Sequence, residues 1–255
     1  MKDLKEFENQ YKKINKSNND DKYCTFAWNL VGWVDEVWHE RPVPFMDYHY
    51  SIMIDKETNP AFKYRLWWLF HRHGDNAFEL LLSKLENGKN VEYHGDIISC
   101  LGRDIIEGIG RYGKYKKRTL EYAIKLTNNC DNWIRENAII VLGWLGSSKE
   151  IGLLGNLLLN DTNAKCRAWS ATSFMHIYFN CKKNKLMVDK SLHYFKQAIS
   201  QETDYYALGC MIDVVKELTG KKFDLPQYAI ENIDTKRIDN AKLKVERFFK
   251  KLYNE

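Results

Sequence analysis

The sequence has few of the residues that interrupt helices. It contains only 4 prolines and 14 glycines among 255 residues. Helices joined by short turns are therefore favoured, and signals for strands are almost absent. No apolar run approaches the length that crosses a bilayer, and the charged start MKDLKEFENQYKK lacks the apolar region of a signal peptide. We therefore expect a cytoplasmic protein that makes no membrane contact.

The sequence also lacks the usual motifs of metal sites, cofactor sites and nucleophilic catalysis. None of its 6 cysteines forms a CxxC pair, so reduced thiols are expected. His71, His73 and Asp75 form the densest group of possible metal ligands, but their spacing matches no known metal motif. There is no P-loop, no dinucleotide-binding glycine pattern and no GxSxG. We expect no metal, no cofactor and no catalytic residue, and hence a protein that is not an enzyme.

Charge is present but modest. The net charge is +5, with 44% hydrophobic and 29% charged residues, which is typical of a globular protein. Residues 1–57 have a net charge of −3, from 8 basic and 11 acidic side chains, and residues 235–255 have +4, from 7 basic and 3 acidic ones. Both segments can be solvated helix faces. A protein that binds duplex DNA usually carries a stronger basic stripe.

The first 57 residues contain two helical patterns and one irregular segment. Apolar residues spaced three to four apart predict a helix over 2–14. The nearly continuous apolar run from Tyr23 to Trp38 predicts a second helix, buried on two sides. Two prolines in Arg41–Pro44 exclude a helix interior there, and the rest of segment 39–57 is either a short helix or extended.

From Asn59 onward the chain alternates between amphipathic helices and short polar turns. Asn59 followed by Pro60 is a good helix start. Ser147 and Glu150 have the spacing of a capping box. Helices are predicted over 59–74, 76–88, 93–110, 113–129, 133–146, 151–160, 163–179, 185–200, 204–218 and 235–253, with a short piece at 225–233.

These helix pairs repeat a pattern. The segment I134-R135-x-x-A138-x-x-x-L142-G143 matches C166-R167-x-x-S170-x-x-x-F174 at a shift of about 32 residues. A weaker match begins at Y93-H94. Small residues at 138 and 170 would allow close approach of the next helix. The arginine at 135 and 167 would bond to an acidic group in an adjacent turn.

The pattern D131-x-x-I134-R135-x-x-A138-x-x-x-L142-G143, followed by a turn and an amphipathic helix, resembles a HEAT repeat. The resemblance implies an all-α fold, a right-handed α-solenoid of stacked antiparallel helix pairs. It would place HEAT-like repeats at 58–220, N-terminal helices with the aromatic-rich insert at 1–57 as part of the same domain, and a basic capping helix at 221–255. A helical bundle without superhelical order is the alternative architecture.

A second resemblance concerns DNWIRENA (131–138), which is similar to helices of HEAT-like alkylpurine DNA glycosylases. That family holds a modified nucleotide with Trp, Asp and Arg side chains on a concave surface. The matching residue types here are Asp131, Trp133, Arg167 and Trp169. No Trp-Trp-Asp stretch precedes them, and packing explains the tryptophans equally well. Nucleic-acid binding is therefore the alternative function.

Two segments that depart from the repeat pattern are candidate binding surfaces. The aromatic-rich insert offers Trp38, Tyr48 and Tyr50, and irregular aromatic loops on rigid scaffolds often carry function. The basic turn 111–118 offers Tyr112, Lys116 and Arg118 for an acidic partner. Rings that fold back into the core and an ordinary solvated turn are the alternatives for the two segments.

The function that we expect is binding of another protein, without catalysis. Small proteins resembling HEAT repeats serve in bacteria as immunity proteins that block a toxin domain, and others are lyase-like or scaffold modules. The Asn- and Lys-rich composition suits a bacterial protein. A toxin domain is therefore the specific partner that we expect. The sequence leaves the oligomeric state open.

Overall fold

The computed structural model describes residues 3–34, 36–108, 110–181 and 185–254. The expected all-α class is confirmed: the protein is 76% helical, with 14 α-helices in the described part that pack mostly against sequence neighbours. Close contacts divide the chain into two compact units, Met1–Tyr93 and His94–Glu255. The helix after Asn59 packs on the preceding helices and belongs to the first of these units.

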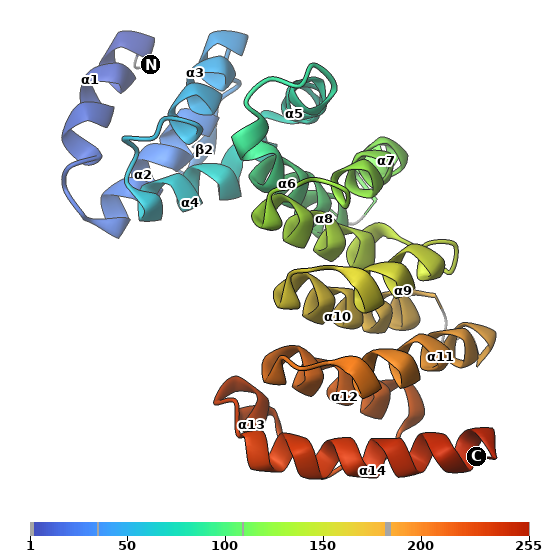
Figure 1. The fold of residues 1–255 in the computed structure, drawn as a ribbon. Coiled ribbons are helices and arrows are strands. Elements are labelled where there is room, and N and C mark those ends of the chain that lie inside the picture. Colours follow the sequence, from blue (N-terminus) through green and yellow to red (C-terminus); the bar gives the residue numbers. More distant parts are fainter. Residues whose placement is uncertain (1–2, 35, 109, 182–184, 255) are drawn as a thin grey trace. The chain divides into compact units, whose positions relative to one another are not determined.

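The N-terminal unit centres on two helices, α2 (Asp20–Val31) and α4 (Pro60–Leu69), which pack against each other (Figure 1). The remaining elements of this unit are α1 (Leu4–Ile14), β1 (Trp33–Val34), β2 (Val37–Trp38), α3 (Val43–Met53), the 3-10 turn Phe70–His73, α5 (Asp75–Glu86) and the 3-10 turn Val91–Tyr93. Helices α1 and α3 both pack against α2.

Phe62 on α4 occupies the centre of this core and is fully buried. Tyr23 stacks on it with ring centroids 4.7 Å apart, and Phe26 meets it edge-on at 5.3 Å. The predicted helix start is confirmed, because the Asn59 side-chain oxygen accepts a hydrogen bond from the Ala61 N–H at 3.0 Å. The cap and the aromatic cluster together fix α4 against α2.

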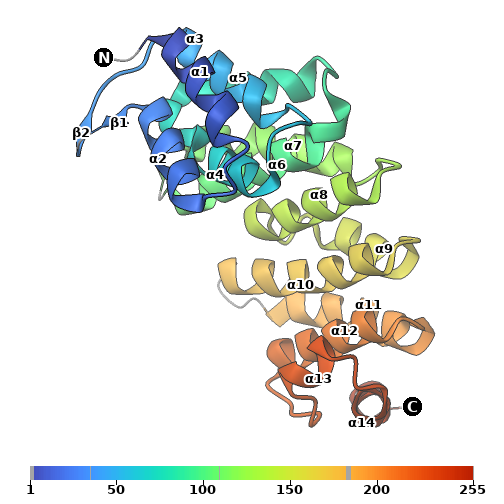
Figure 2. The ribbon, with the colours of Figure 1, turned by 90° about the vertical axis from the view of Figure 1, so that its left-hand side faces the viewer.

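The helix that we expected over 23–38 is wrong in its second half. Helix α2 ends at Gly32, whose φ of 105° lies in the left-handed region that glycine favours. A Cβ at this position would lie 2.0 Å from the His39 carbonyl oxygen. The chain then forms an antiparallel hairpin that pairs Trp33 with Trp38, and it extends away from the helices of this unit (Figure 2). Both tryptophans are exposed, at 41% and 45%, where burial on two sides was expected.

The segment 39–57, which the sequence left open, is largely helical. Helix α3 begins at Val43 with Pro44 in its first turn. Proline is tolerated there because the first N–H groups of a helix need no partner within the helix. The two prolines therefore mark a helix start that follows the hairpin directly.

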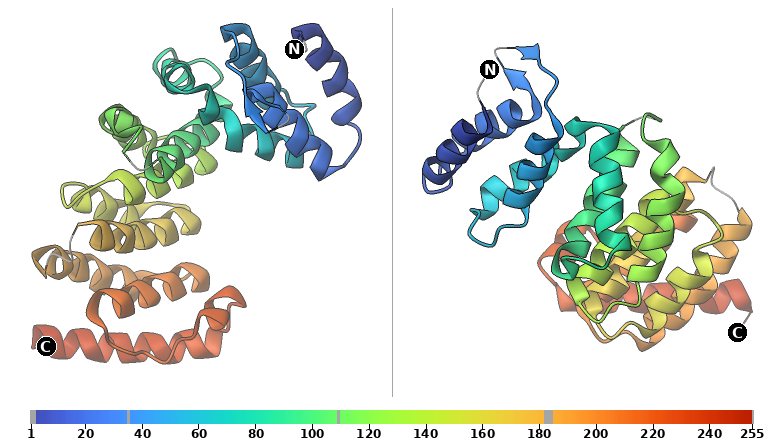
Figure 3. Two further views of the ribbon diagram at one scale, coloured as in Figure 1. Left: turned by 180° about the vertical axis from the view of Figure 1, so that it is seen from behind. Right: turned by 90° about the horizontal axis from the view of Figure 1, so that it is seen from above.

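The C-terminal unit consists of helices in two rows (Figure 1). Helices α6, α8, α10 and α12 pack in succession and form one row. Helices α7, α9 and α11 form the second row alongside it. The same order is visible from behind (Figure 3). The bounds are α6 His94–Glu107, the 3-10 turn Gly113–Tyr115, α7 Lys116–Leu126, α8 Asn132–Leu145, α9 Ile151–Asn160, α10 Ala164–Asn180, α11 Lys185–Gln201, α12 Tyr205–Thr219, α13 Gln227–Glu231 and α14 Thr235–Tyr253.

Small residues allow the helices of the first row to approach closely. A Cβ added to Gly143 on α8 would lie 2.8 Å from the Cα of Ser173 on α10. Ser173 also donates a hydrogen bond to the main-chain oxygen of Ile139 at 2.8 Å. The small residues predicted to face a neighbour, Ala138 and Ser170, are fully buried.

We expect Gly143→Ala to lower the free energy of unfolding by about 1–3 kcal/mol, because the added methyl group forces α8 and α10 apart. Gly152 on α9 is the control, since nothing lies within 4 Å of its Cβ position. There the same substitution should stabilise the protein by about 0.5–1 kcal/mol through helix propensity. Urea unfolding followed by circular dichroism measures both effects; equal effects at the two positions would contradict the close helix contact.

The repeated arginines bond to acidic side chains, as the sequence predicted. Arg135 on α8 donates Nε and Nη2 to the two carboxylate oxygens of Asp161, at 3.0 and 2.9 Å. Arg167 on α10 makes the same bidentate ion pair with Glu202, and both N–O distances are 2.7 Å. We call this arrangement, in which Nε and Nη2 of one arginine bond to the two oxygens of one carboxylate, a fork. In each case the acid follows the second helix of the pair. The fork therefore ties the two helices of a pair together at one end.

Asp161 also connects one pair to the next. While its carboxylate accepts from Arg135, its main-chain oxygen accepts from Arg167 Nη1 at 2.8 Å. The hydrogen bond from Arg167 contributes to holding the Glu202 carboxyl ionised, and it lowers the pKa of that group although burial acts in the opposite direction. The two arginines and two acids form a continuous polar link across successive helix pairs.

Candidate binding surfaces

The hairpin of the N-terminal unit carries exposed indole rings next to a cationic side chain. Trp33 and Trp28 lie 6.5 Å apart by ring centroid. The Arg72 guanidinium lies 5.3 Å from the Trp28 ring, within the range of a cation–π contact. Trp33 and Trp38 present much of their rings to solvent, although β1 packs beside α2. Exposed aromatic rings of this kind are typical of binding surfaces.

A small pocket of about 110 Å³ opens beside Trp38. It lies between the end of α2, the start of α3 and the turn that leads into α5. Its lining residues are Val31, Trp38, Glu40, Arg41, Val43, Met46, Arg72, His73 and Asn76. Two guanidinium groups and one carboxylate thus line a space together with both apolar and polar side chains, and most of its surface is polar.

Arg41 is held between rings and has no counter-ion among the residues that the structure describes. Its Cζ lies 5.0 Å from the Phe45 ring and 5.4 Å from the Phe7 ring, and Nη2 donates to the Asn29 main-chain oxygen at 2.7 Å. Its Nε and Nη1 are buried and have no hydrogen-bond partner among the described residues. Burial lowers the pKa of the Arg41 guanidinium, but an arginine in a protein remains charged. A largely unsatisfied positive charge therefore lies at the wall of this pocket.

His73, also in the pocket wall, is bonded to a fully buried histidine. His49 Nδ1 lies 3.0 Å from His73 Nε2, and His49 Nε2 lies 3.1 Å from the Leu66 main-chain oxygen. Burial, and then the nearby charge of Arg41, lowers the pKa of His73 to about 4, and burial lowers that of His49 well below its usual value. Both rings are neutral at pH 7. Since a carbonyl only accepts, His49 donates from Nε2 and its Nδ1 accepts from His73 Nε2–H.

The two tyrosines predicted for this surface point into the unit. Tyr50 is only 5% exposed, and its hydroxyl accepts a hydrogen bond from Asn90 Nδ2 at 3.3 Å. Tyr48 is half-buried, and burial raises the pKa of its hydroxyl, which is enclosed without a hydrogen-bond partner in the described part of the chain. Both lie on α3, which turns these rings toward the core. Of the predicted residues in this segment, Trp38 alone is well exposed.

In the basic turn the charges face solvent and the rings do not. Tyr112 is 4% exposed, and its ring lies next to Gly108. Lys116 is exposed and Arg118 is half-exposed at the start of α7. Lys116 and Arg118 can contact an acidic partner, whereas Tyr112 is buried within its unit.

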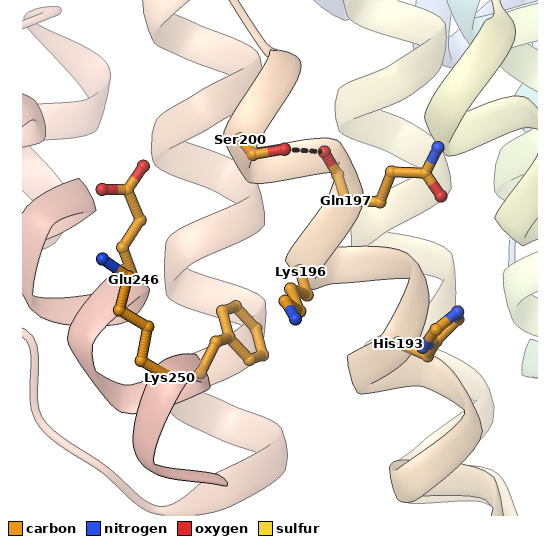
Figure 4. A pocket seen from close by; sticks show the side chains of 7 residues that line it. His193, Lys196, Gln197, Ser200, Glu246 and Lys250 are labelled. Carbon is orange, nitrogen blue, oxygen red and sulfur yellow. Dashed lines mark hydrogen bonds between the residues drawn. The ribbon is translucent and has the colours of Figure 1, made fainter. Parts of the chain in front are cut away.

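The C-terminal unit has an open groove of about 430 Å³ between α11 and α14 (Figure 4). Its walls carry His193, Lys196, Gln197, Ser200, Glu246, Phe249 and Lys250. Ser200 donates to the Gln197 main-chain oxygen at 2.8 Å, as Figure 4 shows, which is a local bond within the helix. The groove has a mixed charge and one aromatic ring.

The residues that resemble the glycosylase site are used within the fold. The Asp131 carboxylate caps α8 by accepting from the Ile134 N–H at 3.2 Å, and Arg167 is engaged by Glu202. Trp133 is exposed at the start of α8, and Trp169 is half-buried on α10. The Asp and Arg groups therefore have intramolecular partners.

Sequence reasoning missed Trp33, Arg41 and Arg72 as members of one surface. The signal was Gly32 inside an apolar run, followed by prolines at 42 and 44, which together mark a chain reversal and not a continued helix. Arg72 comes from a distant segment, so no local pattern connects it to the hairpin.

The described ranges contain no group of three or more His, Cys, Asp or Glu side chains arranged to hold a metal ion. No helix in that part of the chain combines the length and the apolar character that crossing a bilayer requires. Comparison of the chain with known protein families, curated proteins and solved structures finds no significant match.

Proposed function

We propose that this chain is a non-enzymatic protein-binding protein built as a HEAT-like, right-handed α-solenoid. The succession of α6, α8, α10 and α12, with α7, α9 and α11 on their other side, supports this architecture. The repeated forks Arg135–Asp161 and Arg167–Glu202 support it further, since they recur at equivalent places of successive helix pairs. Stacked helix pairs provide a rigid scaffold on which irregular segments can be presented to a partner.

The observation that carries the binding role is the exposed tryptophan pair of the hairpin. Trp33 and Trp38 face each other across a two-residue ladder and are both more than 40% exposed. Tryptophan is among the residues that contribute most to binding energy at protein interfaces, and here two exposed indole rings are paired on one short hairpin. The hairpin also lies next to the charged pocket, so apolar and ionic contacts can be made together.

The partner that we propose is a toxin domain, which this chain would neutralise as a bacterial immunity protein. The test is co-expression with the toxin domain encoded next to its gene. Rescue of growth, together with a one-to-one complex in size-exclusion chromatography, would support the proposal. Continued killing by the toxin in the presence of folded protein would count against it.

We expect the double substitution Trp33→Ser/Trp38→Ser to weaken partner binding by about 100-fold or more, because each ring contributes as a buried anchor in the complex. Titration calorimetry with the partner measures the effect, and circular dichroism checks that helix content is unchanged. Tyr64→Ser/Trp68→Ser is the matched control, since these two exposed aromatic residues lie on α4 of the same unit. Similar losses in both pairs would place the binding surface elsewhere.

The alternative function, a DNA glycosylase acting on alkylated purines, receives less support. The Asp131 and Arg167 side chains that would hold a nucleotide have partners within the chain. The net charge of +5 is also low for a groove that follows phosphates. Salt-sensitive retention of duplex DNA in a gel shift would be the result that revives this alternative.

A further inference from the structure

We infer that the pocket beside Trp38 binds a single carboxylate group of the protein partner, with Arg41 and Arg72 as the groups that recognise it. This inference rests on the proposed protein-binding function and gives the partner a chemical requirement. The partner would present an acidic side chain, or its C-terminal carboxylate, next to an apolar residue that packs on the Trp38 ring.

The first argument is the unsatisfied charge of Arg41. Neither Arg41 nor Arg72 forms an ion pair with any described residue, and two donor nitrogens of Arg41, Nε and Nη1, are enclosed without a partner among those residues. Enclosed donors of a charged group are normally paired, because leaving them unpaired is unfavourable. A carboxylate that enters the pocket brings the missing counter-charge. Rotation of an interface side chain on binding is common, and a small rotation can turn an Arg41 N–H group toward the ligand.

The second argument is the charge of the pocket wall. Arg41 and Arg72 contribute two positive charges, and Glu40 contributes one negative charge. His73 is neutral at pH 7 because burial and Arg41 lower its pKa to about 4. The net charge of +1 matches a carboxylate with one negative charge. A phosphate ester dianion in the same pocket would leave one negative charge uncompensated. The wall therefore favours a carboxylate over a phosphate.

The third argument is size and setting. A pocket of about 110 Å³ has room for a carboxylate with its neighbouring carbon atoms but not for a large ligand. Val43 and Trp38 at its edge are exposed apolar groups, and Val31 and Met46 line its wall. Covering these groups by a partner excludes water and strengthens the ionic contact beneath them. An acidic residue beside an apolar one fits this arrangement.

The test uses the full chain and N-acetylglycine, which carries one carboxylate on a peptide unit. N-acetylglycinamide is the neutral control, and sodium chloride keeps the ionic strength constant. The indole N–H signal of Trp38 in NMR, assigned with Trp38→Phe, reports on the pocket. We expect a saturable shift with N-acetylglycine, none with the amide, and weaker binding of inorganic phosphate. An equal response to the amide, or tighter binding of phosphate, would overturn the inference.

Variants test the two arginines. Arg72→Gln and Arg41→Met should each weaken N-acetylglycine binding about tenfold or more, as expected for loss of a charge-assisted hydrogen bond. Arg65→Gln is the control, since Arg65 is half-exposed on α4, outside the pocket, and pairs with Asp20 at 2.7 Å. Arg72 is exposed, so its variant keeps the test valid if Arg41→Met fails to fold. Unchanged affinity in Arg72→Gln would contradict its role.

Failure of this inference can be distinguished from failure of the proposed function. If the partner binds and its affinity depends on Trp33 and Trp38, but N-acetylglycine does not bind, only the inference that the pocket binds a carboxylate is wrong. If N-acetylglycine binds and the toxin domain does not, the inference of a carboxylate pocket is supported and the proposed partner is wrong.

Discussion

Replacing Arg135 with methionine is expected to lower the free energy of unfolding by about 3–5 kcal/mol, the effect of removing one partner of a buried ion pair. The Arg135 side chain is 10% exposed and that of Asp161 is 4% exposed. Methionine retains much of the length and apolar contact of the arginine stem. The loss therefore reports mainly on the guanidinium group.

The expected effect is large because Arg135 makes several contacts at once. Besides the fork to Asp161, Nη1 donates to the main-chain oxygens of Asn129 and Cys130, at 2.9 and 3.1 Å. Nη2 also donates to the Asn132 side chain at 2.8 Å. Without the guanidinium, these carbonyls lose a donor and the Asp161 carboxylate loses its counter-charge in a buried place.

Arg65→Met provides the control for this prediction. Arg65 makes the same fork with an aspartate, Asp20, but the two side chains are 38% and 55% exposed. An exposed pair contributes about 0–1 kcal/mol, so the control should change stability little. Urea unfolding followed by circular dichroism measures both variants. A loss below about 1 kcal/mol in Arg135→Met would show that the buried fork is not a major support of the C-terminal unit.

The second large effect is expected for Phe62→Ala in the N-terminal unit, with a loss of about 3–5 kcal/mol. Phe62 is fully buried and touches rings from two other helices: Tyr23 and Phe26 on α2, and Tyr11 on α1 at 6.0 Å. Removing its ring leaves a cavity that large, rigid aromatic neighbours cannot easily fill. Thermal or urea unfolding measures the loss.

Tyr64→Ala is the matched control for this second prediction, because Tyr64 lies on the same helix and is exposed. Its removal should change the free energy of unfolding by no more than about 0.5 kcal/mol. If Phe62→Ala were as mild as Tyr64→Ala, the aromatic cluster would not be the core of the N-terminal unit.

Much of the fold could be predicted from the sequence because its signals are local. The Asn59 cap and Pro60 placed the start of α4, and the apolar spacing identified the helices after it. The arginines at 135 and 167 were recognised as structural because they recur at the same place in successive helix pairs. In each of these cases the deciding contacts depend on a spacing that is visible in the sequence.

The candidate site could be predicted only in part. Trp38 was identified and is exposed, but Tyr50 and Tyr112 belong to the cores of their units. Aromatic residues in an irregular segment suit a surface or a core equally well, so composition alone could not separate them. The burial of Tyr50 follows from α3, whose existence the sequence left open.

The sequence by itself determined the all-α class, most helix positions and the repeated arginine contacts, because each depends on periodicity or capping over a few residues. Tertiary structure decided which rings reach solvent and which charges meet. Gly32 adopts a left-handed conformation because the chain must turn back there, and this turn exposes Trp33 and Trp38. The pocket joins Arg41 to Arg72 across 31 positions of sequence. No periodic pattern in the sequence encodes this proximity of two arginines, which arises only when α3 and α4 pack together with α2.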